Sequence, residues 1–252
     1  MFSEIQFFFD ALKLSDGQTR RQMGEGRQLL ASACESFPVD RMIFQRGADG
    51  KVISATFGDG IGCPPAVAIG MGNGYLSLLG IGPYGVGLVA ANAKIIGTAL
   101  AQKLEQPYRF HHQSGECVLS ASRSGVYRIP RMSVISMGKL RRRVVNDYLA
   151  GGRYTLESVG PLIRKGIING IVGQARRLDE TCGGHLESAI GSDDMLDVRV
   201  LEGGVTIAPV KDGLCALIAT NLVVSMNLDL HGAWLAGGMR SYGLGRIYRG
   251  NF

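Results

Sequence analysis

The stretch EIQFFFDALKL, residues 4–14, predicts the first strand of the fold, because it is dense in apolar residues and the turn signal Ser15-Asp16-Gly17 follows at once. The spacing of apolar residues then changes to that of a helix over residues 19–36. Leu29 and Ala33 fall on the side of this helix that would face a core. The chain therefore opens with a strand followed by a helix.

The next segments extend this pattern to a mixed sheet and helix fold. Residues 39–46 and 51–57, separated by a turn, predict a hairpin, and further elements follow as a strand at 72–79, a helix at 86–104 and a strand at 108–112. The order βαββ, then β, α and β, differs from a uniform alternation of parallel strands and helices. It predicts an α+β fold built from ferredoxin-like pieces.

The positive charge of the chain is concentrated in residues 123–180. This segment holds twelve Lys and Arg residues against four acids, an excess of eight, whereas the whole chain has a net charge of +6. Concentrated positive charge is typical of proteins that bind a polyanion such as RNA, and the plain alternative is a solvated charged surface. Apolar residues at helical spacing predict helices over 139–150 and 156–178, with Lys165 and Arg176 close together around the helix axis.

Strand patterns return after this basic segment. Residues 196–201, 204–210 and 215–222 predict three strands separated by turn residues. We therefore expect three parts: a ferredoxin-like part at 1–115, a basic helical insertion at 116–185, and a β-rich C-terminal part at 186–252.

The composition excludes several classes of protein. Of the 252 residues, 46% are hydrophobic and 19% charged, which excludes a disordered chain. The five cysteines are odd in number and none forms a CxxC pair, so neither a zinc nor a disulfide framework is expected. Residues 60–93 carry no charge, but glycines and prolines interrupt them, so we expect no membrane span. No secretory pattern is visible at the N-terminus, and a reducing cytoplasm fits best.

One short motif points to a different function. Residues 80–85, GIGPYG, match the GxGxxG pattern that places a dinucleotide pyrophosphate at a helix N-terminus. Pro83 removes one N–H donor, and the strand near 108–112 lacks the acid that would bind ribose. A packing turn is the simpler interpretation, and a nucleotide-dependent oxidoreductase remains the distant alternative.

The C-terminal segment HGAWLAGGMRSYGLGRIYR, residues 231–249, favours RNA binding more specifically. Its glycines let the backbone approach a phosphate chain, Arg240, Arg246 and Arg249 supply charge, and Tyr242 offers a ring for stacking. A β-bulge followed by a last strand is the structural alternative.

The pattern GG-x-R-S-x-G-x-G-R in this segment resembles the C-terminal glycine-rich loop of the RAMP superfamily of CRISPR-associated proteins. The βαββ start and the run Tyr127-Arg128-Ile129-Pro130, which enters the basic region, are similar to the repeat-processing endoribonucleases of that superfamily. A basic helical insertion between ferredoxin-like parts most resembles the type IV crRNA endonuclease.

This resemblance implies a fold, an activity and partners. The fold would be two ferredoxin-like, RRM-like halves with a basic helical insertion and a C-terminal glycine-rich loop. The activity would be cleavage of CRISPR repeat RNA at the base of its hairpin, without metal or other cofactor, leaving a 2′,3′-cyclic phosphate. The partners would be the mature crRNA, which stays bound, and other subunits of a crRNA-guided effector complex.

The resemblance also suggests which residues act. Many members use a histidine near the first helix, but the first histidine here is His111, and the type IV branch can use arginines instead. His231, just before the glycine-rich loop, is the alternative catalytic residue, although a residue at a strand end is the simpler interpretation. We therefore expect Arg21, Arg41 and Arg240 to orient the scissile phosphate and stabilise its charge. The expected RNA-binding residues are Arg20, Arg27, Arg46, Arg141, Arg142, Arg143, Arg164, Lys165, Arg176, Tyr242 and Arg246.

A second hypothesis is that the protein binds the RNA but does not cleave it. A non-catalytic RAMP subunit that holds crRNA as a scaffold would carry the same glycine-rich loop without a reactive group. Metal-dependent cleavage by paired carboxylates is not expected, because Asp193, Asp194 and Asp197 lie in a turn-like stretch without histidines at ligand spacing.

Overall fold

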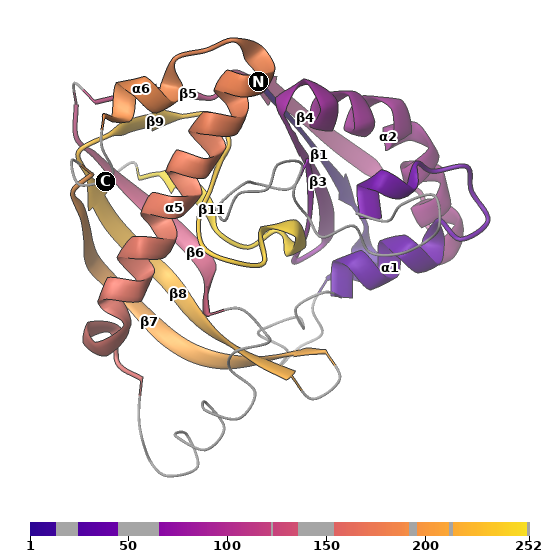
Figure 1. The fold of residues 1–252 in the computed structure, drawn as a ribbon. Helices are drawn as coiled ribbons and strands as arrows, with labels where there is room; N and C mark the ends of the chain where they lie inside the picture. The colour runs from indigo at the N-terminus through magenta and orange to yellow at the C-terminus, as the bar shows by residue number, and fades with distance from the viewer. Residues whose placement is uncertain are drawn as a thin grey trace. The chain divides into compact units, whose positions relative to one another are not determined.

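The computed structural model describes residues 1–13, 25–44, 66–121, 123–135, 154–191, 196–211 and 214–250 (Figure 1). The chain forms two compact units. The first consists of Met1–Asp59, Pro65–Gly115 and Ser241–Gly243, and the second of Gly60–Pro64, Glu116–Arg240 and Leu244–Phe252.

The first unit has the βαββαβ order of a ferredoxin-like domain. Its main elements are β1 (Phe2–Phe8), α1 (Glu25–Ala33), β2 (Val67–Gly72), β3 (Tyr75–Ile81), α2 (Gly82–Leu104) and β4 (Arg109–Gly115). The sheet has the order β2-β3-β1-β4, and all three pairings are antiparallel. Two short 3-10 helices, η1 (Asp10–Leu12) and η2 (Arg41–Phe44), complete the described part of this unit.

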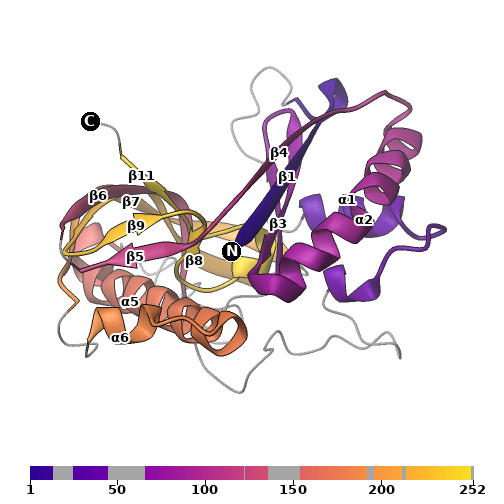
Figure 2. The same ribbon diagram turned by 90° about the horizontal axis from the view of Figure 1, so that it is seen from above.

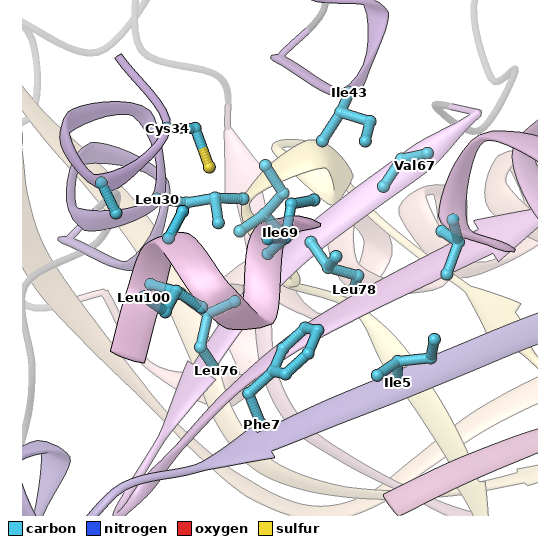
Figure 3. Packing of buried hydrophobic residues seen from close by; sticks show 14 of the residues in the cluster. Ile5, Phe7, Leu30, Cys34, Ile43, Val67, Ile69, Leu76, Leu78 and Leu100 are labelled. Atoms are coloured by element: carbon cyan, nitrogen blue, oxygen red, sulfur yellow. The ribbon is translucent and has the colours of Figure 1, made fainter. Parts of the chain in front are cut away.

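The core of the first unit lies between one face of this sheet and its two helices. Ile5 and Phe7 alternate with more exposed residues along β1, so they point to one face of the sheet. They pack with Leu76 and Leu78 of β3 and with Leu30 of α1, as Figure 3 shows. Both helices therefore cover a single face of the sheet.

Three predictions for this unit are wrong. The first strand, predicted over 4–14, ends at Phe8, and Asp10–Leu12 form η1. Residues 41–44 form η2 instead of a strand, with Ile43 buried in the core. The hairpin lies further along the chain, where β2 and β3 flank Asn73-Gly74, and Gly74 has a φ of 80°. Asn-Gly is a strong signal for a two-residue hairpin turn, so residues 72–79 hold the turn and most of β3 instead of one strand. The predicted strand at 51–57 lies outside the described residues.

The second unit repeats the strand order of the first. Its elements are β5 (Val118–Ser120), β6 (Gly125–Ile135), α5 (Leu156–Cys182), α6 (Leu186–Ile190), β7 (Val198–Lys211), β8 (Leu214–Met226), β9 (Asp229–His231), β10 (Trp234–Leu235), η4 (Arg240–Tyr242) and β11 (Arg246–Arg249). The main sheet has the order β10-β11-β6-β8-β7. Because β6, β7, β8 and β11 take the places of the four ferredoxin-like strands, the segment between β8 and β11 stands where a second helix would lie.

Helix α5 forms as its sequence predicts. Thr155 caps its N-terminus by accepting a hydrogen bond from the N–H of Ser158, and Gly183, with a φ of 69°, ends it. The apolar residues Val159, Ile163, Ile167 and Ile171 are all buried. In Figure 1 the helix runs along the sheet that contains β6, β7 and β8.

The segment 116–185 contains more than helices. Strand β6, with eleven residues, begins at Gly125, and α5 belongs to the same compact unit as the C-terminal strands. The predicted strands at 196–201 and 204–210 are one strand, β7, with shifts in register around Glu202. Gly203 has a φ of 148°, so this site is an irregularity within the strand rather than a turn. The predicted helix at 139–150 lies outside the described residues.

Helix α2 is the one described helix long and apolar enough to cross a membrane, by length and composition alone. In this structure it is the core helix of the first unit, with Val89, Ile96 and Leu100 fully buried against the sheet.

Candidate nucleic-acid interface

The glycine-rich segment from Ala236 to Gly245 is held by backbone hydrogen bonds within the second unit. Ala236 N–H donates to Gly245 C=O (2.8 Å), and Gly245 N–H donates to Arg131 C=O (2.7 Å). Gly238 N–H donates to Ser133 C=O (2.9 Å). The residues Gly237, Met239, Gly243 and Gly245 have positive φ, which explains the need for glycine at three of these four positions.

Helix α5 supports the chain just before this segment through a buried glutamine. Gln174 is fully buried, its Nε2 donates to Ala233 C=O (2.6 Å), and its Oε1 accepts from Leu235 N–H (3.2 Å). Gly237 N–H also donates to Gly166 C=O of α5 (2.9 Å). The start of the glycine-rich segment is therefore fixed to the most regular helix of the unit.

Two of the predicted arginines lie in or beside the segment. Arg240, in η4, and Arg246, at the start of β11, are both half-buried. The guanidinium carbon of Arg246 lies 5.7 Å from the ring centroid of Tyr248, and Tyr248 is 46% exposed and pairs with Arg128 of β6. Sequence reasoning chose Tyr242 for stacking and missed Tyr248; the conformation of the Tyr242 side chain lies outside the described residues.

The basic residues of α5 have different surroundings along the helix. Arg164 and Lys165 are exposed, and within the described residues no ion pair involves either of them. Arg176 pairs with Glu187 (2.6 Å) and Arg177 with Glu180 (3.2 Å). Positive charge available to a partner is therefore greater in the first half of the helix.

In the first unit the predicted residues Arg27 and Arg41 come from neighbouring elements. Arg27 of α1 donates to the C=O of Phe44, which ends η2, and Arg41 at the start of η2 is exposed. The remaining predicted site residues lie outside the described residues: Arg20, Arg21, Arg46, Arg141, Arg142 and Arg143.

The histidines occupy three different settings. His111 and His112 are consecutive in β4, so their side chains lie on opposite faces, and His112 Nε2 is 3.0 Å from Ser3 Oγ. His185 caps α6 and is exposed. His231 ends β9 and is the histidine with charged partners.

His231 and Arg249, both named from the sequence, form a cluster with Asp229 that the sequence did not predict. Arg249 Nη1 lies 2.8 Å from Asp229 Oδ1 and 2.7 Å from His231 Nε2, which is itself 3.3 Å from Asp229 Oδ2. The Asp229 side chain is 8% exposed, and that of His231 55%. Burial raises the pKa of the nearby Tyr127 hydroxyl, which donates to Leu228 C=O (2.8 Å). A buried carboxylate between an arginine and an accessible imidazole can orient that imidazole.

Residues 80–85, GIGPYG, end β3 and begin α2, and they pack against their own unit. Gly82 N–H donates to Met1 C=O (3.0 Å), and Ile81 N–H donates to Ala66 C=O (3.0 Å). A side chain at Gly80 would overlap the backbone of Gly85. The sheet that leads into this segment is antiparallel, whereas the dinucleotide-binding fold is built on a parallel sheet, so the segment gives no support to an oxidoreductase.

Within the described ranges no group of three or more His, Cys, Asp or Glu side chains could hold a metal ion.

The two units together have an α+β double ferredoxin-like fold. Three solved structures share it over 99% of this chain and 99% of their own: Csf5, a CRISPR-Cas type IV Cas6 crRNA endonuclease (TM-score 0.56, 14% identity), a crystal structure of Cas6b (0.56, 10%) and the CRISPR RNA processing endoribonuclease Cas6b (0.54, 11%). The predicted fold class is confirmed, and so is the resemblance to repeat-processing endoribonucleases at the level of fold. No protein-family profile and no curated protein matches the chain.

Proposed function

We propose that this protein is an endoribonuclease that matures CRISPR RNA and stays bound to its product, acting in the cytoplasm without a metal ion. The observation that carries the proposal is the double ferredoxin-like fold with a glycine-rich segment in place of the second helix of its second unit. Proteins with this fold include the crRNA endonuclease Csf5.

The proposed reaction is an internal transfer at one phosphate. The ribose 2′-oxygen forms a bond to phosphorus, the bond from phosphorus to the 5′-oxygen breaks, and a 2′,3′-cyclic phosphate and a 5′-hydroxyl result. The 2′-hydroxyl loses a proton and the leaving 5′-oxygen gains one. The charge that develops on the phosphorane oxygens must be stabilised by fixed cations or N–H donors.

Arginines supply this stabilisation in the proposal. Arg41 and Arg240 lie in short 3-10 helices, and Arg21 is the third proposed member of the site. Guanidinium groups stay protonated at neutral pH, so they orient and stabilise the phosphate but do not accept the proton. Exposed Arg164 and Lys165 of α5 would contact the phosphate backbone of the hairpin.

A histidine mechanism is the second candidate, and the cluster of Asp229, His231 and Arg249 favours it. Nε2 of His231 lies near both Asp229 and Arg249. In the tautomer whose Nε2–H donates to Asp229, Nδ1 is the atom that can accept a proton. In this version Arg249 would contact the phosphate, and Asp229 would orient the imidazole.

One experiment tests the activity. The protein is incubated with repeat RNA from its own locus in EDTA, and the ends of the fragments are analysed for a cyclic phosphate and a 5′-hydroxyl. Cleavage at one site in the presence of the chelator supports the proposal. Tight binding of intact RNA would replace it with the scaffold function, and cleavage only after addition of a divalent ion would exclude a metal-independent reaction.

Comparing variants then separates the two mechanisms. If arginines stabilise the transition state, Ala at Arg41 or Arg240 slows cleavage and Ala at His231 leaves the rate close to that of the wild type. The reverse pattern would assign the reaction to His231.

A further inference from the structure

The first unit presents a second face of its sheet to which no described helix is attached. Helices α1 and α2 pack on the face that carries Ile5 and Phe7, and Figures 1 and 2 show both helices on the same side of β1 and β3. Phe8, between the core residues Phe7 and Phe9, therefore points to the opposite face. We call this opposite face the Phe8 face.

Two aromatic rings lie side by side on the Phe8 face. Phe8 of β1 pairs with Tyr75 of β3, and the centroids of their rings are 5.8 Å apart with an angle of 47° between the ring planes. Both residues are half-buried, and the ring of Tyr75 fills the space above Gly72 of β2. On the other side of Phe8, Arg109 of β4 is exposed and pairs with Phe8 directly.

The next row across the sheet carries groups that form hydrogen bonds. Gly70, Ser77, Gln6 and His111 are consecutive partners across β2, β3, β1 and β4. Ser77 and Gln6 are half-buried and His111 is exposed. The aromatic rings of the first row can stack on bases, and the arginine at its end can contact a phosphate. The Ser, Gln and His of the second row can form hydrogen bonds with the edges of bases.

A third row of residues lies across the sheet on the side of the second row away from Phe8. It contains buried Ala68 and Leu79, and then Glu4, whose carboxylate accepts from Gln6 Nε2 (3.3 Å). A carboxylate repels a phosphate chain, so nucleotides would lie along the two rows nearer Phe8.

The glycine-rich segment reaches the edge of the same face. Gly243, with a φ of 72°, lies directly against Gly70, because a side chain at Gly243 would come within 2.5 Å of the Gly70 Cα atom. Residues Ser241–Gly243 belong to the first unit, so the row of Gly70, Ser77 and Gln6 begins beside Gly243 within that unit.

We propose that the Phe8 face binds unpaired nucleotides that flank the repeat hairpin, with one base stacked on Phe8 and the next on Tyr75. This inference rests on the proposed function, because it places part of the same RNA. Arg109 contacts a phosphate of these nucleotides, and Gln6 and His111 contact base edges. Aromatic residues on the two central strands of a four-stranded sheet are the stacking positions of RRM domains.

Comparing two RNAs tests the proposal. One is repeat RNA with its single-stranded flanks, and the other is the same hairpin trimmed to stem and loop; both carry a fluorescent label. The variant is the double substitution Phe8→Leu and Tyr75→Leu, which keeps apolar side chains and removes both rings. Loss of stacking weakens binding by about 5- to 100-fold for each base. Because the double variant removes both rings, we expect a loss of about 25-fold or more for the flanked RNA and almost none for the trimmed hairpin.

The matched control is Phe110→Leu. Phe110 is an aromatic residue of the same sheet, 64% exposed, but it pairs with Phe7 and so lies on the helix side. Affinity for the flanked RNA should stay at the wild-type value in this variant. An equal loss with Phe110→Leu, or no loss with the double variant, would overturn the assignment of the Phe8 face.

Two further measurements cover the cases in which the double variant does not fold or the proposed function is wrong. If the double variant does not fold, Arg109→Glu reverses an exposed charge on the same face and should weaken binding of the flanked RNA alone; unchanged binding overturns the proposal. Failure of the proposed function is seen separately, because it would abolish cleavage and binding of the trimmed hairpin by the wild-type protein.

Discussion

Replacing Gln174 with leucine should loosen the support of the glycine-rich segment. Gln174 is fully buried in α5, and its amide forms hydrogen bonds with the C=O of Ala233 and the N–H of Leu235, which are buried themselves. Leucine has a similar size but no polar atoms. The substitution Gln174→Leu therefore leaves the N–H of Leu235 without the acceptor that it has in the wild type. The C=O of Ala233 keeps only the weak thiol donor of Cys117 (3.4 Å).

The cost follows from these two groups. A buried polar group that loses its partner costs about 1–3 kcal/mol, and the C=O of Ala233 loses less because it keeps the thiol, so the free energy of unfolding should fall by roughly 1–4 kcal/mol. For a chain of this length each kcal/mol lowers the midpoint of thermal unfolding by about 2–4 °C, which gives a decrease of about 2–16 °C. Because Ala233 and Leu235 lead directly into the glycine-rich segment, RNA cleavage should also slow at temperatures where the variant is still folded.

Thermal unfolding followed by circular dichroism measures the effect, with Gln102→Leu as the control. Gln102 is an exposed glutamine in helix α2, so the same change of side chain removes no buried contact there. A decrease in the midpoint of less than about 2 °C for Gln174→Leu would show that water or other groups replace both hydrogen bonds, and the argument from burial would be wrong.

Three further predictions concern charge, catalysis and thiols. Replacing all three arginines at 141–143 with alanine should weaken binding of the hairpin and reduce the dependence of the affinity on salt concentration. If a folded variant showed the wild-type dependence of affinity on salt, this segment would be excluded from the interface. Alanine at Arg41 or Arg240 should slow single-turnover cleavage by about 10²–10³-fold with little change in affinity for RNA. Quenched reactions analysed on gels measure the rate, and a wild-type rate would exclude these arginines from the site. Burial raises the pKa of the Cys34 thiol to about 11, so this thiol stays protonated at pH 8. It should therefore react with iodoacetamide far more slowly than exposed Cys182, as measured by mass spectrometry of the labelled peptides. Equal rates of labelling would contradict the buried position of Cys34.

The parts of the fold that the sequence predicts correctly are those with a local pattern. Helix α5 has a capping threonine, buried residues at helical spacing and a terminal glycine, all within one segment. Strand β1 and helix α2 also have patterns that lie within one segment, so they could be predicted without knowing which elements they pack against. The ferredoxin-like order of the first unit followed from the order of such elements, whereas two ferredoxin-like halves were expected only from the resemblance.

The prediction of a strand at 39–46 failed because distant residues decide its conformation. Asp40 N–H donates to Asn92 Oδ1 of α2 (2.9 Å), and Asp40 Oδ1 accepts from Met42 N–H (2.8 Å), which starts η2. Arg27 of α1 then holds the end of η2 at Phe44. Asn92 is 52 residues away in the chain, so a local apolar pattern could not reveal this contact.

The candidate site was predictable in its residue types but not in its clusters. The glycine and arginine pattern of the C-terminus is visible in the sequence, and Asp229 and His231 show the spacing of neighbours on one side of a strand. Their contact with Arg249 depends on the pairing of β11 with β6, where Arg249 lies opposite Tyr127. Tyr127 in turn bonds the backbone on both sides of Asp229, at Leu228 and Leu230.

The glycines that suggest RNA binding have two different physical roles. A side chain at Gly170 of α5 would meet Leu235 O at 2.6 Å and the Cα of Ala236 at 2.7 Å, so this glycine lets the helix and the segment pack backbone to backbone. A side chain at Gly238 would find its nearest neighbour at 3.5 Å, which is ordinary van der Waals contact, so internal packing does not require glycine there. The N–H of Gly238 already donates to the C=O of Ser133, so its backbone is partly engaged within the unit. Packing therefore explains the glycine of α5 that faces the C-terminal segment, whereas phosphate binding at Gly238 stays a prediction.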